Sequence, residues 1–330
     1  MAKVVFCNIA WMRLYSGITD NDQPKNGGAF VKENNDACES FNFYPYNHYC
    51  LGYVRAPGER LNLARVEDVP DDVDKIDDVT VIWVATNDTG RHIVGWYEHA
   101  EMYRYYQYFE DSIVENHTYW QYNFKTREEN AYIIPEELRN FRVLSASKAG
   151  AGLGMGQSNL WYADSAITKE KFVPKVLEYL EKIRPQTIQQ YWRKEFVEKI
   201  ADIQGKNVEE LNELAANETN PGKLFAIDNL IISMNPPDMF KARFQRAADL
   251  EFYLLYDEAI EEYQRALACV TDEDKDSDTY LTCLFNLQRL LEFTGKYFLG
   301  WEMAQRCLAE SKTIEDKCLS WQAVKEILNW

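Results

Sequence analysis

The sequence predicts an α+β protein with a β-rich N-terminal domain, residues 1–165, and an all-α C-terminal domain, residues 166–330. Two observations predict the first domain. Short segments rich in β-branched and aromatic residues alternate there with Gly, Asn, Asp and Pro turns, and 26 of the 46 Phe, Trp and Tyr residues lie in this half. A third observation predicts the second domain: after Ile167 the apolar residues recur at the three- and four-residue spacing of helices.

The N-terminal domain contains nine segments that we expect to form strands: Val4–Ala10, Tyr49–Val54, Val79–Thr86, His92–Tyr97, Met102–Phe109, Tyr119–Lys125, Ala131–Ile134, Phe141–Ala146 and Asn159–Tyr162. The stretch from Ser16 to Cys38 carries a Gly pair and many Asn and Asp residues. A loop of that length is often a lid or a binding element. Asp71–Asp78 is expected to be an exposed, acidic connection.

Helices are expected through most of the C-terminal domain. The first begins near Thr168, and after an interruption at Pro185 a second is expected from about Thr187 to Ile203. The segment Asn235-Pro-Pro-Asp238 predicts a helix start at Met239 or Phe240. A terminal helix is expected from Ile314 to Trp330.

One helix has the pattern of a known repeat. Tyr256–Leu267, with small Ala and bulky Tyr residues on one face, strongly resembles the second helix of a tetratricopeptide (TPR) repeat, and a related pattern recurs 41 residues later from Tyr297. That interval exceeds the usual repeat length of about 34 residues. The resemblance implies a TPR-like helical domain that binds a protein partner. A generic helical bundle is the alternative.

Composition limits the class of function. The formal net charge is −17, which repels phosphate at long range and argues against salt-driven binding of nucleic acid or of an anionic membrane. No apolar run reaches the ~20 residues that span a bilayer, and the N-terminus lacks the pattern of a signal peptide. Seven cysteines without a C-x-x-C pair favour reduced thiols. We therefore expect a cytoplasmic protein without membrane partners.

Motifs for catalysis are missing from the sequence. It has no phosphate-binding P-loop, no H-E-x-x-H and no G-x-S-x-G elbow, and the four histidines lack metal-ligand spacing. The glycine-rich loop Gly150–Gly156 does not match a dinucleotide fingerprint, because Met155 replaces the last Gly and a strand-like segment follows. We predict no cofactor, no metal and no catalytic residues. A metal-dependent hydrolase or nuclease built from scattered carboxylates is an open alternative.

Aromatic residues around the hairpin near residue 90 suggest a binding pocket. Trp83, Trp96 and Tyr97 lie on its two strands, and Trp11 and Trp161 lie at other strand ends. Such residues are often core, but several together can enclose a flat ligand, and aromatic rings stack on nucleobases. The sequence therefore predicts an aromatic pocket for a planar ligand.

The hairpin Val81–Tyr97, with its Asn-Asp-Thr-Gly turn, is similar to the strand, turn and strand of modified-base readers in the PUA-like superfamily, which includes the EVE and YTH domains. Ser158-Asn-Leu-Trp161 resembles the segment that supplies a cage tryptophan in that family. The resemblance implies that residues 1–165 form a mixed β-barrel that reads a modified or flipped base of DNA, RNA or a nucleotide. It also suggests a role in prokaryotic restriction or defence.

The expected ligand-binding residues follow from the aromatic set and this resemblance. Trp83, Trp96 and Trp161 would form the aromatic walls, with Trp11 and Tyr97 beside them. Ser158 and Asn159 would bond the ligand edge, and Arg104 would contact phosphate. The alternative function is a protein-interaction scaffold that does not bind nucleic acid.

Overall fold

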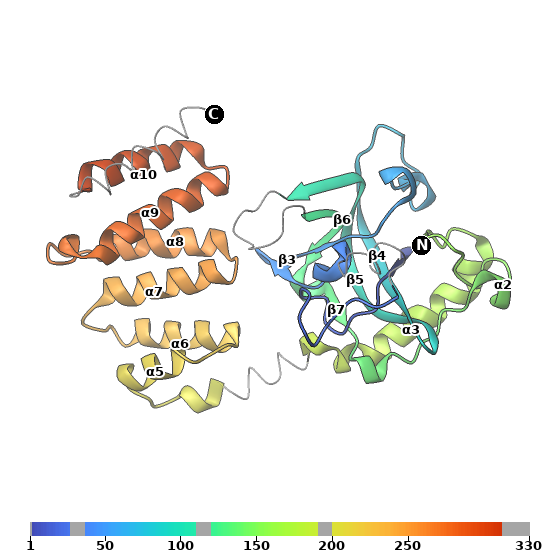
Figure 1. The fold of residues 1–330 in the computed structure, drawn as a ribbon, viewed down its shortest axis with the longest axis horizontal. Coiled ribbons are helices and arrows are strands. Elements are labelled where there is room, and N and C mark those ends of the chain that lie inside the picture. The colour runs from blue at the N-terminus through green and yellow to red at the C-terminus, as the bar shows by residue number, and fades with distance from the viewer. Residues whose placement is uncertain (1, 27–36, 110–119, 191–199, 312–330) are drawn as a thin grey trace. The chain divides into compact units, whose positions relative to one another are not determined.

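The computed structural model describes residues 2–26, 37–109, 120–190 and 200–311. It divides into two compact units, Met1–Lys194 and Glu195–Trp330 (Figure 1). This division falls after the boundary near residue 165 that the sequence suggests. The difference arises because helix α3 (Val173–Ile183) packs its apolar face against the sheet of the N-terminal unit.

The N-terminal unit is built on a mixed sheet with the strand order β2-β3-β6-β5-β4-β1-β8, and β7 pairs with β5 beside this path. Its strands are β1 (Lys3–Ile9), β2 (Pro45–Tyr46), β3 (Tyr49–Gly52), β4 (Lys75–Asn87), β5 (Gly90–Phe109), β6 (Trp120–Arg127), β7 (Ala131–Ile133) and β8 (Leu160–Trp161). Strands β1 and β4 are parallel, and the other described pairs are antiparallel.

The described sheet is open, with β2 and β8 at its edges, so the closed barrel that the resemblance implies is not seen. Three predicted strands also differ in extent. His92–Tyr97 and Met102–Phe109 belong to one continuous strand, β5, and β4 begins at Lys75, inside the expected acidic connection. Phe141–Ala146 is not a strand; Arg142 forms only an isolated bridge with His92.

Each face of the sheet carries its own core. One cluster includes Cys7, Ile9, Trp83 and Tyr97 and lies under the loops of the N-terminal segment. The other includes Phe6, Trp96 and Met155 and is covered by α3 (Figure 1). Residues of β1 alternate between the two clusters, as the two-residue period of a strand requires. The sheet therefore separates two sets of aromatic side chains.

The C-terminal unit is a stack of antiparallel helices in chain order (Figure 1). They are α5 (Val208–Ala215), α6 (Pro221–Ser233), α7 (Met239–Phe252), α8 (Tyr256–Leu267), α9 (Asp278–Phe293) and α10 (Tyr297–Glu310). Asn207, Asn220, Asp238 and Ser277 cap four of their N-termini with side-chain oxygens. The predicted helix starts at Tyr256 and Met239 agree with these boundaries. The predicted terminal helix Ile314–Trp330 and much of Thr187–Ile203 lie outside the described residues.

Short helices complete the described chain. The 3₁₀ turns are η1 (Cys38–Phe41), η2 (Pro57–Glu59), η3 (Leu63–Arg65), η4 (Glu128–Asn130), η5 (Glu136–Leu138), η7 (Arg184–Gln186), η8 (Ala201–Ile203) and η9 (Asp274–Asp276). The four-residue α2 (Ala146–Ala149) precedes the glycine-rich loop, and a π-helical turn, η6 (Thr168–Phe172), leads into α3. No helix in the described ranges is long and apolar enough to cross a membrane.

Candidate functional site

Trp83 and Trp96 lie on opposite faces of the sheet, so they cannot form two walls of one slot. Trp83 is opposite Gly95, whereas Val84 is opposite Ile93, so β5 has one extra residue at this point. Such a β-bulge reverses the face of every residue beyond it. Without the bulge the two indoles would share a face. The structure therefore does not bring these two residues together in one aromatic pocket.

Neighbouring side chains fill the space around both indoles. Trp83 is 0% exposed, and the rings of Tyr97 and Phe124 meet it edge-on at centroid distances of 5.2 and 5.7 Å. Trp96 is also 0% exposed; the Tyr132 ring stacks on it at 4.7 Å, and the Arg184 guanidinium lies over both rings. Both tryptophans are core residues, with no open ring face for a base.

Three other predicted site residues have structural contacts of their own. Trp11 is buried, donates its indole N–H to Glu136 (2.9 Å) and has the Arg139 guanidinium over its ring. The Tyr97 hydroxyl is buried and donates to the carbonyl of Asn42. Arg104 is 1% exposed and donates to the carbonyls of Val73 (2.6 Å) and Pro70 (3.0 Å). Arg104 therefore anchors a loop and does not present its charge for a phosphate contact.

Ser158, Asn159 and Trp161 lie together at the β8 edge of the sheet. Trp161 is half-buried and stacks on Phe6 with a centroid distance of 4.9 Å, which leaves one side of the indole for Phe172 at 5.2 Å. The Ser158 hydroxyl is exposed and accepts the backbone N–H of Leu160 (3.2 Å). Asn159 is half-buried, and no hydrogen bond of its side chain is found with the residues described.

Asn8 adds a second amide beside Asn159. The backbone N–H of Asn8 donates to the carbonyl of Asn159 at 2.7 Å, which places these residues directly across the β1–β8 edge. Strand alternation puts both side chains on the face of Phe6 and Trp161, because Cys7 and Leu160 belong to the opposite core. The Oδ1 atom of Asn8 is buried and accepts no hydrogen bond from any described residue. Such an atom is costly unless a partner satisfies it.

Arg91, on β5, approaches the loop that leads to this edge. Its Nη1 lies 3.5 Å from the carbonyls of Met155 and Gly156, in the loop that leads to Ser158, and its buried Nε has no hydrogen-bond partner among the described residues. Burial lowers the pKa of the guanidinium, because a low-dielectric surrounding disfavours the charge. A ligand with an acceptor group for the Arg91 Nε–H would lower the free-energy cost of burying this guanidinium. We call Asn8, Arg91, Ser158 and Asn159 the polar edge.

Sequence reasoning missed Asn8 of the polar edge, and it placed Arg91 only in a positive rim around the expected pocket. Asn8 interrupts the otherwise apolar run Val-Val-Phe-Cys-Asn-Ile, and a polar residue in a buried strand is itself a signal. Arg91 follows the hairpin turn and looks like an ordinary exposed turn residue. Only the pairing of β4 with β5 directs it toward the glycine-rich loop.

The glycine-rich loop has a packing function in this arrangement. A Cβ on Gly154 would lie 2.6 Å from the carbonyl oxygen of Leu144, and one on Gly152, whose φ is +76°, would lie 2.4 Å from Ile167. The loop leads into strand β8 and not into a helix. It therefore lacks the helix N-terminus that a phosphate-binding loop provides.

The described residues contain no metal-binding cluster, and the four buried thiols among them are not activated. No group of three or more His, Cys, Asp and Glu side chains within the described ranges could hold a metal ion. Burial raises the pKa of the thiols Cys7 and Cys50 well above the ordinary value, and that of Cys283 and Cys307 to about 12. A thiol with a raised pKa is a poor nucleophile.

The chain was compared with known proteins in three ways. No family model matches it, and neither a curated protein nor a solved structure matches it.

Proposed function

We propose that the N-terminal unit is a binding module for a nucleobase, modified or flipped out of its strand, and that the polar edge reads the edge of that base. The single observation that carries this proposal is that two polar groups of this set, the Asn8 Oδ1 acceptor and the Arg91 Nε donor, are buried without a partner among the described residues. Amide and guanidinium groups are the side chains that recognise base edges by paired hydrogen bonds.

The proposal keeps Ser158, Asn159 and the neighbouring Trp161 from the sequence prediction. It replaces the aromatic slot by recognition through hydrogen bonds, because the rings of Trp83 and Trp96 are closed by their neighbours. The similarity of Ser158–Trp161 to modified-base readers supports the same edge. Extrusion of a base exposes its hydrogen-bonding edge, and few phosphate contacts are then needed.

Binding of fluorescent oligonucleotides with and without base modifications tests this function. We expect Arg91→Gln and Asn159→Ala to weaken the tightest complex about tenfold or more, since a good bidentate contact is worth about 1–3 kcal/mol. Arg55→Gln is the matched control, because Arg55 is exposed and the same charge is removed away from the polar edge. Normal binding by both polar-edge variants, with circular dichroism showing a native fold, would reject the proposal.

A second candidate function, a protein-interaction scaffold, is favoured by an apolar patch on the helical unit. Phe252 is 75% exposed at the end of α7, and Phe298 is 69% exposed at the start of α10, with Tyr297 and Leu299 beside it. The α7–α8 and α9–α10 turns lie at the same end of the stack (Figure 1). Large apolar side chains exposed at one end of a helical stack are candidates for contact with a protein partner. The buried small residues Ala259, Gly300 and Ala304 support a TPR-like arrangement.

Affinity purification with the intact chain tests the scaffold. A stoichiometric protein partner that is lost on Phe252→Ser together with Phe298→Ser, with no nucleic acid or nucleotide present, would favour this function. Persistence of that partner in the double variant would show that the patch is not its binding site.

A further inference from the structure

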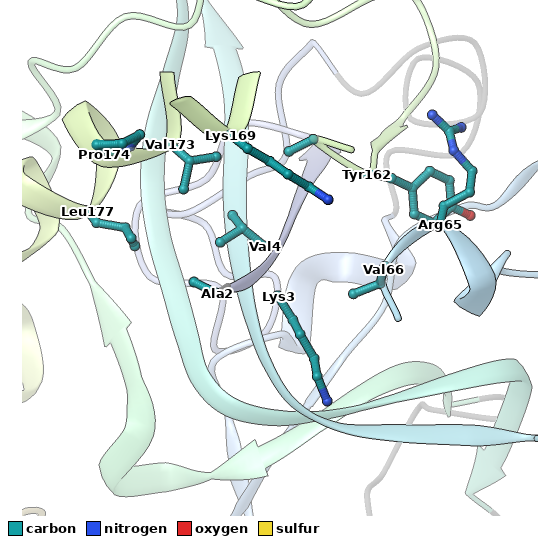
Figure 2. A pocket seen from close by; sticks show the side chains of 11 residues that line it. Ala2, Lys3, Val4, Arg65, Val66, Tyr162, Lys169, Val173, Pro174 and Leu177 are labelled. Atoms are coloured by element: carbon teal, nitrogen blue, oxygen red, sulfur yellow. The ribbon is translucent and has the colours of Figure 1, made fainter. Parts of the chain in front are cut away.

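A pocket at the opposite end of β1 has a different chemistry from the polar edge. It has a volume of about 210 Å³ and lies between the start of β1, the η3 region, Tyr162 and the η6–α3 segment (Figure 2). Its apolar wall is made by Val4, Ala163, Val173 and Leu177. An engineered cavity of about 150 Å³ binds benzene, so this pocket has room for a body of about six carbons.

The polar groups at this pocket are almost all donors. Lys3, Arg65 and Lys169 supply N–H groups and carry no acceptor, and the Tyr162 hydroxyl already accepts the backbone N–H of Asn62 (2.8 Å). None of the lining side chains is a carboxylate or an amide. A donor-rich mouth beside an apolar wall matches an amphipathic anion.

The ion pairs around the pocket leave one positive charge unmatched. Lys3 pairs with Glu67 at 2.7 Å, and Arg65 pairs with Asp164 at 2.7 and 3.0 Å while its guanidinium lies 4.4 Å from the centre of the Tyr162 ring. Lys169 forms no direct ion pair with any residue that the structure describes, although its charge helps to lower the pKa of the Asp164 carboxyl that pairs with Arg65. In Figure 2 its side chain extends between Val4 and Tyr162. Two carboxylates thus offset two of the three cations.

We propose that this pocket binds a small organic monoanion, a carboxylate carried on an apolar body of about six carbons, with Lys169 as the charge that holds it. The single unmatched charge fits a carboxylate better than a dianionic phosphate monoester. The apolar body packs against Val4, Val173 and Leu177. This site shares no residue with the polar edge, so the two can be tested independently.

Calorimetric titration of the full-length protein with phenylacetate tests the proposal. We expect binding of phenylacetate, no detectable binding of its neutral analogue phenylacetamide, and weaker binding of phenyl phosphate. Lys169→Gln should weaken phenylacetate binding about tenfold, since a hydrogen bond to a charged group contributes about that much. Lys171→Gln removes the same charge from the same turn outside the pocket and should leave binding unchanged.

Four results would overturn the proposal. Equal affinity for phenylacetate and phenylacetamide would show that no charge is recognised. Equal weakening by Lys169→Gln and Lys171→Gln would show a general effect of charge, and tighter binding of phenyl phosphate would remove the preference for a monoanion. Absence of phenylacetate binding at concentrations up to about 10 mM, which corresponds to a binding free energy weaker than about 3 kcal/mol, would also reject the site.

Discussion

Asp228 shows at the scale of one residue how burial sets a response to pH. It lies on α6 at 4% exposure, and its Oδ2 accepts no hydrogen bond from the described residues. Burial raises the pKa of its carboxyl from 3.8 to about 7; the charges of Asp249 and Glu262 act in the same direction, and that of Arg246 opposes them. The folded helical unit therefore prefers the neutral acid.

The raised pKa predicts that Asp228→Asn stabilises the helical unit at alkaline pH. Below pH 3.8, the pKa of Asp228 in the unfolded chain, the carboxyl is neutral in both the folded and the unfolded state. Between about pH 4 and 7 it is ionised in the unfolded state and still neutral in the folded state. The folded helical unit therefore loses stability as the pH rises through this range. The loss should reach about 2–4 kcal/mol above pH 7. Urea unfolding at pH 4.5 and pH 8 measures it: the variant should gain stability mainly at pH 8.

The exposed Asp202 provides the control for this pH experiment. Asp202→Asn should leave the pH dependence of unfolding as it is in the unsubstituted protein. If Asp228→Asn had the same effect at both pH values, the carboxyl of Asp228 would not be the group that titrates.

At the scale of elements, the packing of β3 against β4 and β5 depends on Gly52. A Cβ at this position would lie 2.6 Å from Cζ2 of Trp83 and 2.8 Å from Cε2 of Tyr97. Because both rings are fully buried, neither can move away without disturbing the core. The absence of a side chain on β3 is what makes room for the indole.

Gly52→Ala should therefore destabilise the N-terminal unit by about 1–3 kcal/mol, the usual cost of overpacking a core. Gly156→Ala is the matched control, because a Cβ there meets no atom within 4 Å. Chemical denaturation of both variants, followed by tryptophan fluorescence, measures the difference. Equal stability of the two variants would mean that Trp83 does not pack on β3 as described.

At the scale of the whole molecule, a net charge of −17 sets how nucleic acid can bind. A basic protein that makes 6–10 phosphate contacts loses about 10³–10⁵ in affinity between 50 and 200 mM salt. The polar edge contains one guanidinium and no other cation. If one or two phosphates are neutralised, the affinity should fall only about three- to twelvefold over the same range.

Oligonucleotide titrations at 50 and 200 mM salt measure this dependence. A shallow slope is expected because recognition depends on hydrogen bonds to the base and not on release of counterions. A loss of a thousandfold or more would place the binding surface on a cationic region other than the polar edge.

Sequence patterns predicted most of the elements because their signals are local. The apolar alternation of Val4–Ala10, the Asn-Asp-Thr-Gly turn and the Asn-Pro-Pro-Asp helix start each act over a few neighbouring residues, and the structure has β1, the β4–β5 hairpin and α7 at these places. The helical period likewise placed α8 at Tyr256–Leu267. Local propensity and periodicity are sufficient for such elements.

The candidate site was predicted only in part because side-chain direction depends on pairing across strands. Ser158, Asn159 and Trp161 follow the glycine-rich loop and do lie together. Trp83 and Trp96 were assigned to the same pocket, and a single extra residue in β5 puts them on opposite faces. Nothing in the one-dimensional pattern marks that bulge, since it depends on how the two strands twist and pack.

By itself, the sequence determined a strand-rich N-terminal half, a helical C-terminal half, the strongly acidic charge and the places where most elements begin. The tertiary structure alone decided the open sheet, the allocation of α3 to the N-terminal unit, and which polar atoms are left without partners. The physical reason is how far apart in the chain the interacting residues lie. Turns and periodicity are set by neighbouring residues, whereas strand register, burial and unmatched hydrogen-bonding groups are set by distant residues that only folding brings together.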